Sequence, residues 1–211
     1  MKEVTSHYDE LSERYDQKIN IYCQRRFIGI IKKYIGKKQR ILEVGCATGY
    51  IQNKLNKSII GIDLTHKLLK KNKNKVICAD ALAIPFKDGS FDAVYSVNVL
   101  EHVNSPEQMI GECRRVAKKN GKIIFITPNG DMEFFLDVAE KLKLKLPEGP
   151  HEFLGFEKLK SIIKKDNLKI ISAERFVFVP FRLPLITSVS EKFEKLVPNF
   201  CLFQAIICNK R

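Results

Sequence analysis

The feature that most constrains this chain is an apolar segment that runs into a turn of small residues and then into helical sequence. Residues 41–50 read Ile-Leu-Glu-Val-Gly-Cys-Ala-Thr-Gly-Tyr. Gly45 allows a sharp turn off the strand, and Ala47 and Gly49 let the backbone approach a ligand closely. Amide groups at the start of the following helix would face that ligand. The segment therefore predicts the first strand, turn and helix of a ligand-binding α/β sheet.

Strand-like and helix-like segments alternate through the rest of the chain. Apolar runs predict strands at residues 41–44, 59–62, 76–78, 91–97 and 122–127, with helices between them at 49–57, 65–73 and 105–119. Further helices are expected at 131–143, 156–166 and 188–196, and closing strands at 169–179 and 201–208. Because parallel strands are joined by helical crossovers, this order predicts a Rossmann-like, doubly wound α/β sheet of seven mostly parallel strands with helices on both faces.

Two acidic residues near the turn indicate which ligand it binds. Asp63 ends the second expected strand, 18 residues after Gly45, where a carboxylate can accept hydrogen bonds from both hydroxyls of a ribose. Glu43 precedes the glycines, and the turn lacks the Gly-x-Gly-x-x-Gly spacing of dinucleotide sites. A carboxylate attracts an ammonium group and repels a pyrophosphate. The turn therefore favours S-adenosylmethionine, whose methionine part carries an ammonium, over a nicotinamide dinucleotide.

Further motifs connect this turn to a known family. Cys78-Ala79-Asp80-Ala81 follows the third strand, and Pro85-Phe86-Lys87-Asp88-Gly89-Ser90-Phe91-Asp92 precedes and enters the fourth. Together with the turn they resemble class I S-adenosylmethionine-dependent methyltransferases. Residues 97–103 (Val-Asn-Val-Leu-Glu-His-Val) and 127–129 (Thr-Pro-Asn) are similar to the branch that includes the ubiquinone and menaquinone biosynthesis methyltransferases. The resemblance covers about residues 38–130.

The resemblance implies a role for each matching position. Expected contacts with the methionine part and the ribose come from Gly45, Cys46, Ala47, Gly49, Asp63 and the backbone around Val97, with Glu43 supporting the turn. Asp80 would accept from the adenine amino group, between Leu64 and Ala81. Ala47 stands where many relatives have glycine. Taken singly, Asp63 could cap a helix, Asp80 could shape a turn and Gly45 could end a strand.

The resemblance also implies how the single expected domain is divided. We assign a helical cap to residues 1–36, the cofactor-binding core to 38–130, and a substrate-side insert with closing strands to 131–211. Apolar residues of the cap recur at three- and four-residue steps, as in amphipathic helices. We expect this cap to form a lid in which the Tyr15 hydroxyl contacts the methionine end of the cofactor.

Methyl transfer needs the nucleophile held in line with the methyl group, so no catalytic residue is obligatory. For a hydroxyl acceptor a general base helps, and the candidates are His102 and His151. Each has a structural alternative, His102 packing between strand and helix and His151 lying on a surface turn.

Composition limits the function further. The six cysteines are scattered without metal-site spacing, so we expect no metal. Neither a signal peptide nor a membrane span is evident, which predicts a cytoplasmic protein.

The net charge of +13 attracts anionic partners. We expect a small-molecule methyl acceptor, such as a hydroxylated aromatic, quinone-like or lipid-like compound. The alternatives are an RNA methyltransferase and a noncatalytic cofactor-binding protein. No nucleic-acid partner is expected; weak peripheral membrane contact through residues 176–186 and the oligomeric state stay open.

Overall fold

The computed structural model describes residues 2–36, 39–55, 58–135, 151–178, 194 and 196–211. A seven-stranded sheet in the order β3-β2-β1-β4-β5-β7-β6 forms its centre. The strands are β1 (Ile41–Val44), β2 (Ile59–Asp63), β3 (Lys75–Cys78), β4 (Phe91–Val97), β5 (Ala117–Pro128), β6 (Leu168–Phe176) and β7 (Phe203–Lys210). Strands β1 to β5 pair in parallel, and β7 lies antiparallel between β5 and β6. The predicted Rossmann-like, mostly parallel α/β sheet is confirmed.

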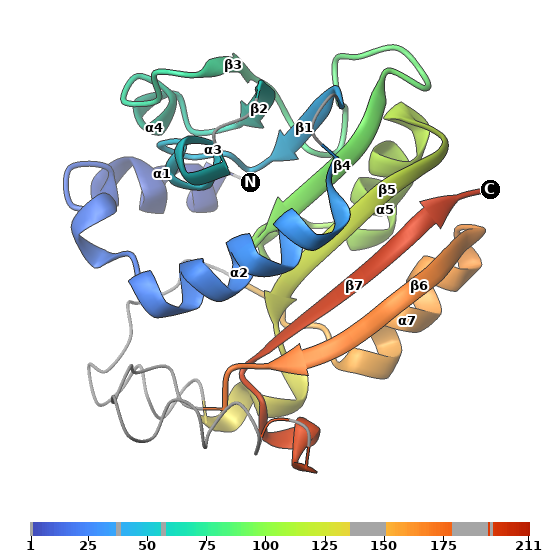
Figure 1. The fold of residues 1–211 in the computed structure, drawn as a ribbon. Coiled ribbons are helices and arrows are strands. Elements are labelled where there is room, and N and C mark those ends of the chain that lie inside the picture. Colours follow the sequence, from blue (N-terminus) through green and yellow to red (C-terminus); the bar gives the residue numbers. More distant parts are fainter. Residues whose placement is uncertain (1, 37–38, 56–57, 136–150, 179–193, 195) are drawn as a thin grey trace.

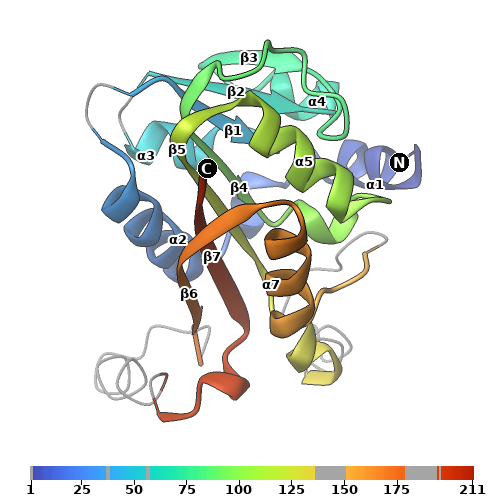
Figure 2. The ribbon, with the colours of Figure 1, turned by 90° about the vertical axis from the view of Figure 1, so that its right-hand side faces the viewer.

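Helices cover both faces of this sheet (Figures 1 and 2). The α-helices are α1 (Lys2–Leu11), α2 (Ile21–Tyr34), α3 (Tyr50–Leu55), α4 (His66–Leu69), α5 (Pro106–Val116) and α7 (Phe156–Lys165), and the 3-10 turns are η1 (Asp16–Lys18), η2 (Leu100–His102), η3 (Gly130–Met132) and η4 (Pro198–Phe200). Helices α2 and α3 contribute to the core on one face, and α5 and α7 contribute to the core on the other.

Local sequence explains where two of these helices begin. The Asn20 side chain caps α2 by accepting from the Cys23 amide at 3.1 Å. The Ser105 hydroxyl caps α5 by accepting from the Gln108 amide, and Pro106 occupies its first turn. The apolar faces that follow these caps then pack on the sheet.

The strand order reverses between β1 and β4, and this reversal positions the functional site. The chain runs outward from β1 through β2 to β3 and then returns to place β4 on the other side of β1. At such a switch point the connections leave the sheet in opposite directions, so a crevice opens at the carboxyl ends of the two strands. The small-residue turn follows β1 directly at this crevice.

Several element boundaries differ from the sequence predictions. The N-terminal helical region consists of two α-helices and a 3-10 turn, and α4 is shorter than expected from residues 65–73. Strand β6 ends at Phe176 because Val177 has a φ of +63°, which leaves the extended region. The Val177 amide instead donates to the Glu194 carboxylate at 3.0 Å, and Arg26 of α2 pairs with the same carboxylate at 2.6 Å.

Other sequence predictions fall partly or wholly outside the described residues. The helix expected at 131–143 begins as η3 and continues helically through residues 133–135. Most of the helix expected at 188–196, and the apolar stretch after residue 178, lie outside the described residues. The division of the domain at residues 36, 38 and 130 stays a prediction. None of the helices in the described part is long and apolar enough to cross a bilayer.

Candidate functional site

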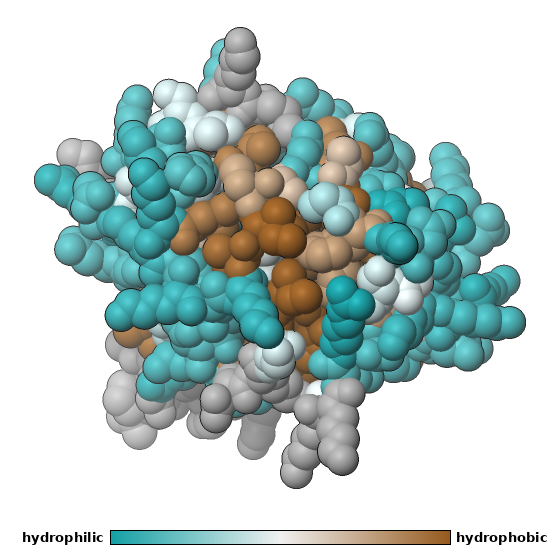
Figure 3. Space-filling view, turned by 90° about the horizontal axis from the view of Figure 1, so that it is seen from above, coloured by the Kyte–Doolittle hydropathy of each residue, from teal (hydrophilic) through white to brown (hydrophobic). Residues whose placement is uncertain are grey.

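A cavity of about 730 Å³, counting its open mouth, lies at the carboxyl ends of β1, β2 and β4 beneath α1. From above, hydrophobic residues gather in a hollow surrounded by hydrophilic ones (Figure 3). The cavity is lined by Val4, Thr5, Tyr8, Tyr15, Val44, Gly45, Ala47, Ile62, Asp63, Leu64, Thr65, Leu68, Ala79, Asp80, Ala81, Val97, Asn98, Val99, His102 and Val103.

The turn after β1 forms one wall of this cavity and leaves no room for larger side chains. The Gly45 and Cys46 amides donate to the Ile62 carbonyl at 2.8 and 3.0 Å. Gly45 has a φ of +77°, and a Cβ atom there would overlap the Val99 side chain. Gly49 has a φ of +82°, and a Cβ atom there would overlap the Asn72 side chain. Gly45 thus allows the backbone to border the cavity, and Gly49 allows the turn to pack closely on Asn72.

Asp63 lies at the end of β2, where its carboxylate joins two loops. Asp63 Oδ2 accepts from the Ala47 amide at 2.9 Å, and Oδ1 accepts from the Thr65 amide at 2.8 Å. Burial raises the pKa of this carboxyl, and the two amides oppose that rise. A carboxylate has about four acceptor positions, so these two bonds leave acceptor capacity at a residue that lines the cavity. Holding the loops and binding a ligand are therefore compatible.

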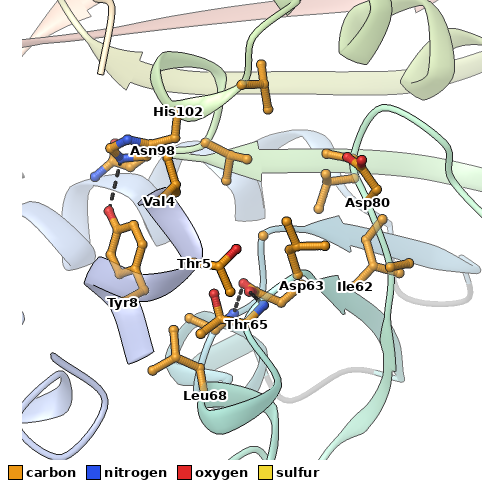
Figure 4. Close-up of a pocket in the computed structure, with 18 of the residues that line it drawn as sticks. Val4, Thr5, Tyr8, Ile62, Asp63, Thr65, Leu68, Asp80, Asn98 and His102 are labelled. Atoms are coloured by element: carbon orange, nitrogen blue, oxygen red, sulfur yellow. Dashed lines mark hydrogen bonds between the residues drawn. The ribbon is translucent and has the colours of Figure 1, made fainter. Parts of the chain in front are cut away.

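Asp80 marks one end of the cavity, and Tyr8, Asn98 and His102 lie at the other, with Asp63 between them (Figure 4). Asp80 Oδ1 accepts from the Leu82 amide at 2.8 Å, which is the turn-forming contact considered from the sequence. Asp80 also lines the cavity together with Leu64, Ala81 and Val97. The structure thus brings these predicted cofactor residues together.

Three predicted cofactor residues, Glu43, Cys46 and Gly49, do not line the cavity. Glu43 is 2% exposed, and one of its carboxylate oxygens has no hydrogen-bond partner. Burial raises the pKa of the Glu43 carboxyl well above its ordinary value. Cys46 is also buried, and its sulfur accepts from Asn72 Nδ2 at 3.7 Å. Glu43 and Cys46 lie behind the turn, where they can support it, and Gly49 belongs to the turn without bordering the cavity.

The N-terminal segment covers the cavity as a lid. Val4, Thr5, Tyr8 and Tyr15 all line it, and α1 packs against α4. Burial and nearby carboxylates, Asp63 first among them, raise the pKa of the Tyr15 phenol far above its ordinary value. Tyr15 therefore stays protonated and can donate a hydrogen bond into the cavity, although its predicted contact with the cofactor stays a prediction.

The two candidate bases occupy different positions. His102, the last residue of η2, lines the cavity, and its Nε2 lies 3.0 Å from the Tyr8 hydroxyl. The His151 ring centroid lies 6.5 Å from that of His102 and stacks on Phe153 at 4.2 Å, outside the cavity lining. The geometry favours His102 over His151 as a base for a ligand in this cavity.

The Asn98 side chain lines the cavity but was not predicted from the sequence. Asn98 follows β4 with a φ of +53°, lines the cavity, and has a buried Oδ1 atom without a hydrogen-bond partner. An unsatisfied buried acceptor is costly unless a ligand supplies a donor. The available signal was an asparagine directly after a buried strand, because asparagine tolerates left-handed backbone. Val4, Thr5 and Leu68 gave no comparable signal. Among the described residues, no group of three acidic, histidine or cysteine side chains could hold a metal ion.

The features of the cavity fit an adenosine ligand that carries a cationic methionine part. Its acidic lining residues are Asp63 and Asp80, the glycine positions leave room for a ligand against the backbone, and Asn98 Oδ1 offers a buried acceptor to a donor group. A pyrophosphate of a dinucleotide, by contrast, would meet two aspartates and no lysine or arginine among the described lining residues, so no opposite charge would balance it.

Comparison with known proteins agrees with this assignment. A family model described as a methyltransferase domain matches residues 42–125. An uncharacterised protein of Methanocaldococcus jannaschii is 33% identical over an alignment of 189 residues, covering 81% of this chain and 78% of that protein. A ubiquinone biosynthesis O-methyltransferase of Methylococcus capsulatus is 32% identical over 135 residues, covering 56% of each chain. The solved structure of a SAM-dependent methyltransferase from Thermotoga maritima shares the fold, with a TM-score of 0.77, 21% identity and coverage of 97% of this chain and 98% of that one.

Proposed function

The chain belongs to the class I S-adenosylmethionine-dependent methyltransferases, and on this premise we propose that its acceptor is a hydroxyl group of a small, uncharged molecule. S-adenosylmethionine, when bound, supplies a methyl group on a sulfonium that a nucleophile displaces in line. The protein's own residues must then bind both partners, orient the nucleophile and receive its proton. A hydroxylated aromatic or quinone-like compound fits this description.

The charge of the cavity lining carries the proposal. The chain has a net charge of +13, yet the described lining residues include two aspartates and no lysine or arginine. A phosphate or carboxylate on the acceptor would find no opposite charge there, whereas a cationic donor would. Similarity to ubiquinone biosynthesis O-methyltransferases supports a hydroxyl acceptor of the same kind.

Roles follow for the residues that line the donor part of the cavity. Asp63 would accept from the ribose hydroxyls with the acceptor positions that Ala47 and Thr65 leave available. Asp80 would accept from the adenine amino group in the same way, beyond its bond to Leu82. The backbone of the Gly45 turn would border the methionine part. Glu43 would support the turn from behind, outside the cavity lining.

His102 is the residue we propose as general base. It lies at the opposite end of the cavity from Asp80, where an acceptor hydroxyl could deliver its proton to the imidazole (Figure 4). His151 would support this end through its edge-on contact with the His102 ring.

Isothermal titration with S-adenosylhomocysteine first establishes the donor site. Matched acceptors are then compared with radiolabelled S-adenosylmethionine: catechol, its carboxylated analogue 3,4-dihydroxybenzoate, and an aromatic amine of similar size. We expect methyl transfer to catechol at more than ten times the rate of transfer to the other two. Equal or faster transfer to the carboxylated analogue or the amine by a protein that binds the donor product would contradict the uncharged hydroxyl acceptor.

The positive charge of the surface keeps RNA as a second candidate acceptor. Phosphate contacts would make RNA binding fall steeply as salt increases. Filter binding of a structured RNA between 50 and 200 mM salt measures this salt dependence. Methylation of that RNA at physiological salt would replace the small-molecule proposal.

Co-sedimentation with anionic liposomes at low salt tests peripheral membrane contact of the same protein preparation.

A further inference from the structure

One hydrogen bond joins the lid to the candidate base. The Tyr8 hydroxyl of α1 lies 3.0 Å from His102 Nε2, although the two residues are 94 positions apart. Their ring centroids are 5.5 Å apart and the ring planes are nearly perpendicular. Both side chains line the cavity, and Figure 4 shows the phenol reaching the imidazole from the lid side. The contact therefore lies within the site and not on the outer surface.

The backbone that carries His102 is fixed on several sides. The His102 amide donates to the Val99 carbonyl at 2.9 Å. The preceding residue, Glu101, is 3% exposed and accepts from the Thr127 hydroxyl at 2.9 Å, while its carbonyl accepts from the Glu152 amide at 2.8 Å. The hydrogen bond with Tyr8 acts on the imidazole itself, at one ring nitrogen.

The lid is itself held so that Tyr8 reaches this position. Lys71 donates to the Ser12 carbonyl at 2.8 Å and pairs with Glu13 at 3.2 Å. After α1, Asp16 accepts from the Thr48 hydroxyl of the turn at 2.6 Å. The segment just after α1, residues 12–16, is thus tied to the cofactor-binding part of the fold. These contacts hold α1 where the Tyr8 phenol reaches His102.

We propose that Tyr8 is a positioning residue for His102: its hydroxyl donates to Nε2, so that the neutral imidazole carries its proton on Nδ1. In a neutral imidazole one nitrogen donates and the other accepts, so a donor held against Nε2 selects this tautomer. The basic nitrogen then faces the lid and the cavity. An acceptor hydroxyl reaches Nε2 either in place of the Tyr8 hydroxyl or through it, and both routes require Nε2 to be unprotonated. The inference rests on the proposed use of His102 as a base and adds the lid residue that prepares it.

The tautomer can be measured without donor or acceptor. The chain has four histidines, His7, His66, His102 and His151, so the ring nitrogens of protein labelled with 15N-histidine can be assigned from single histidine-to-glutamine variants. Spectra are recorded above the ordinary titration range of imidazole, where unprotonated and protonated ring nitrogens have well-separated shifts. The wild type is compared with Tyr8→Phe and with the matched control Tyr15→Phe, which removes a neighbouring lid hydroxyl.

We expect wild-type His102 to be predominantly protonated at Nδ1, and Tyr8→Phe to lose that preference in favour of protonation at Nε2. Tyr15→Phe should keep the wild-type tautomer, and the His66 signals should stay unchanged as a check on folding. Protonation of His102 at Nε2 in the wild type, or an unchanged tautomer in folded Tyr8→Phe, overturns the proposal. Failure of S-adenosylhomocysteine to bind the same samples would instead refute the proposed donor site, so the two ideas fail separately.

Discussion

Ala47 donates its backbone amide to Asp63 Oδ2 at 2.9 Å, so the carboxylate at the end of β2 holds the turn that follows β1. The same carboxylate accepts from the Thr65 amide at the start of α4. Because a single side chain fixes both loops and also lines the cavity, its removal should affect ligand binding more than global folding.

The first prediction concerns the charge on Asp63. Asp63→Asn should weaken S-adenosylhomocysteine binding about 10- to 100-fold, because hydrogen bonds to a charged group contribute roughly 1.5–3 kcal/mol. Isothermal titration measures the change. Asp88→Asn is the matched control, since Asp88 lies outside the cavity lining and its side chain is 78% exposed. Equal affinities for wild type and Asp63→Asn would show that the carboxylate does not hold the ribose.

The second prediction compares two glycines with left-handed backbone. Gly45 and Gly89 have φ angles of +77° and +62°, but a Cβ atom would overlap Val99 only at Gly45. Alanine at either position pays about 1–2 kcal/mol for its φ angle, and overpacking adds about 1–3 kcal/mol at position 45. Urea unfolding should therefore show Gly45→Ala as the less stable variant, and only this variant should lose S-adenosylhomocysteine binding. Equal losses of stability would indicate that Val99 moves aside without cost.

The third prediction concerns the dependence of stability on pH. Burial raises the pKa of Glu43 above its ordinary 4.5, so above this pH the unfolded chain releases a proton that the folded chain retains. Stability contributed in this way is fully present at low pH and is lost as the pH rises. The difference in free energy of unfolding between Glu43→Gln and the wild type should therefore grow in favour of the variant as the pH rises from about 4.5.

Urea unfolding of the wild type and Glu43→Gln at several pH values gives the change of this free-energy difference with pH. That change does not depend on any pH-independent effect of the glutamine amide on stability. Glu157→Gln is the control of opposite sign, because Lys160 lowers the pKa of the exposed Glu157 carboxyl. Parallel stability curves for wild type and Glu43→Gln would mean that Glu43 titrates as it does in the unfolded chain.

The site residues that could be predicted from the sequence are those at the ends of short apolar strands. The turn at Gly45 and the carboxylates Asp63 and Asp80 each follow a short apolar strand, and parallel strands bring their carboxyl ends to one edge. Both the sheet and the cavity that contains these residues could thus be expected from local patterns. The contact of Tyr8 with His102 could not, because it depends on where a lid helix docks across 94 residues of sequence.

Backbone conformation explains other differences from the sequence predictions. Val177 belongs to an apolar, β-branched stretch that favours a continued strand, yet it takes a φ of +63° and bonds to Glu194. The competing interaction is tertiary: Glu194 is 5% exposed and pairs with Arg26 from a helix far away in sequence. Cys46 was expected to contact the cofactor because it belongs to the turn motif, but its side chain is buried behind the turn, on the side where Glu43 supports it.

The last prediction concerns the cost of Asn98 in the absence of a ligand. Asn98 has a φ of +53° and a buried Oδ1 atom without a partner, two features that destabilise a protein unless a ligand compensates for them. Asn98→Gly removes both, and should raise the free energy of unfolding by up to about 1 kcal/mol while weakening S-adenosylhomocysteine binding several-fold. Asn120→Gly is the matched control, since Asn120 has a similar φ of +61° outside the cavity lining.

Urea unfolding and isothermal titration on the same samples separate the two effects. The control should change stability alone, because glycine relieves the left-handed backbone there without removing a cavity acceptor. If Asn98→Gly gains stability and binds S-adenosylhomocysteine as tightly as the wild type, then Asn98 Oδ1 does not accept a hydrogen bond from this ligand. The buried Oδ1 atom would then be assigned to binding the methyl acceptor. Loss of both stability and binding would mean that the Asn98 side chain stabilises the end of β4 and that its Oδ1 atom is not an acceptor for a ligand.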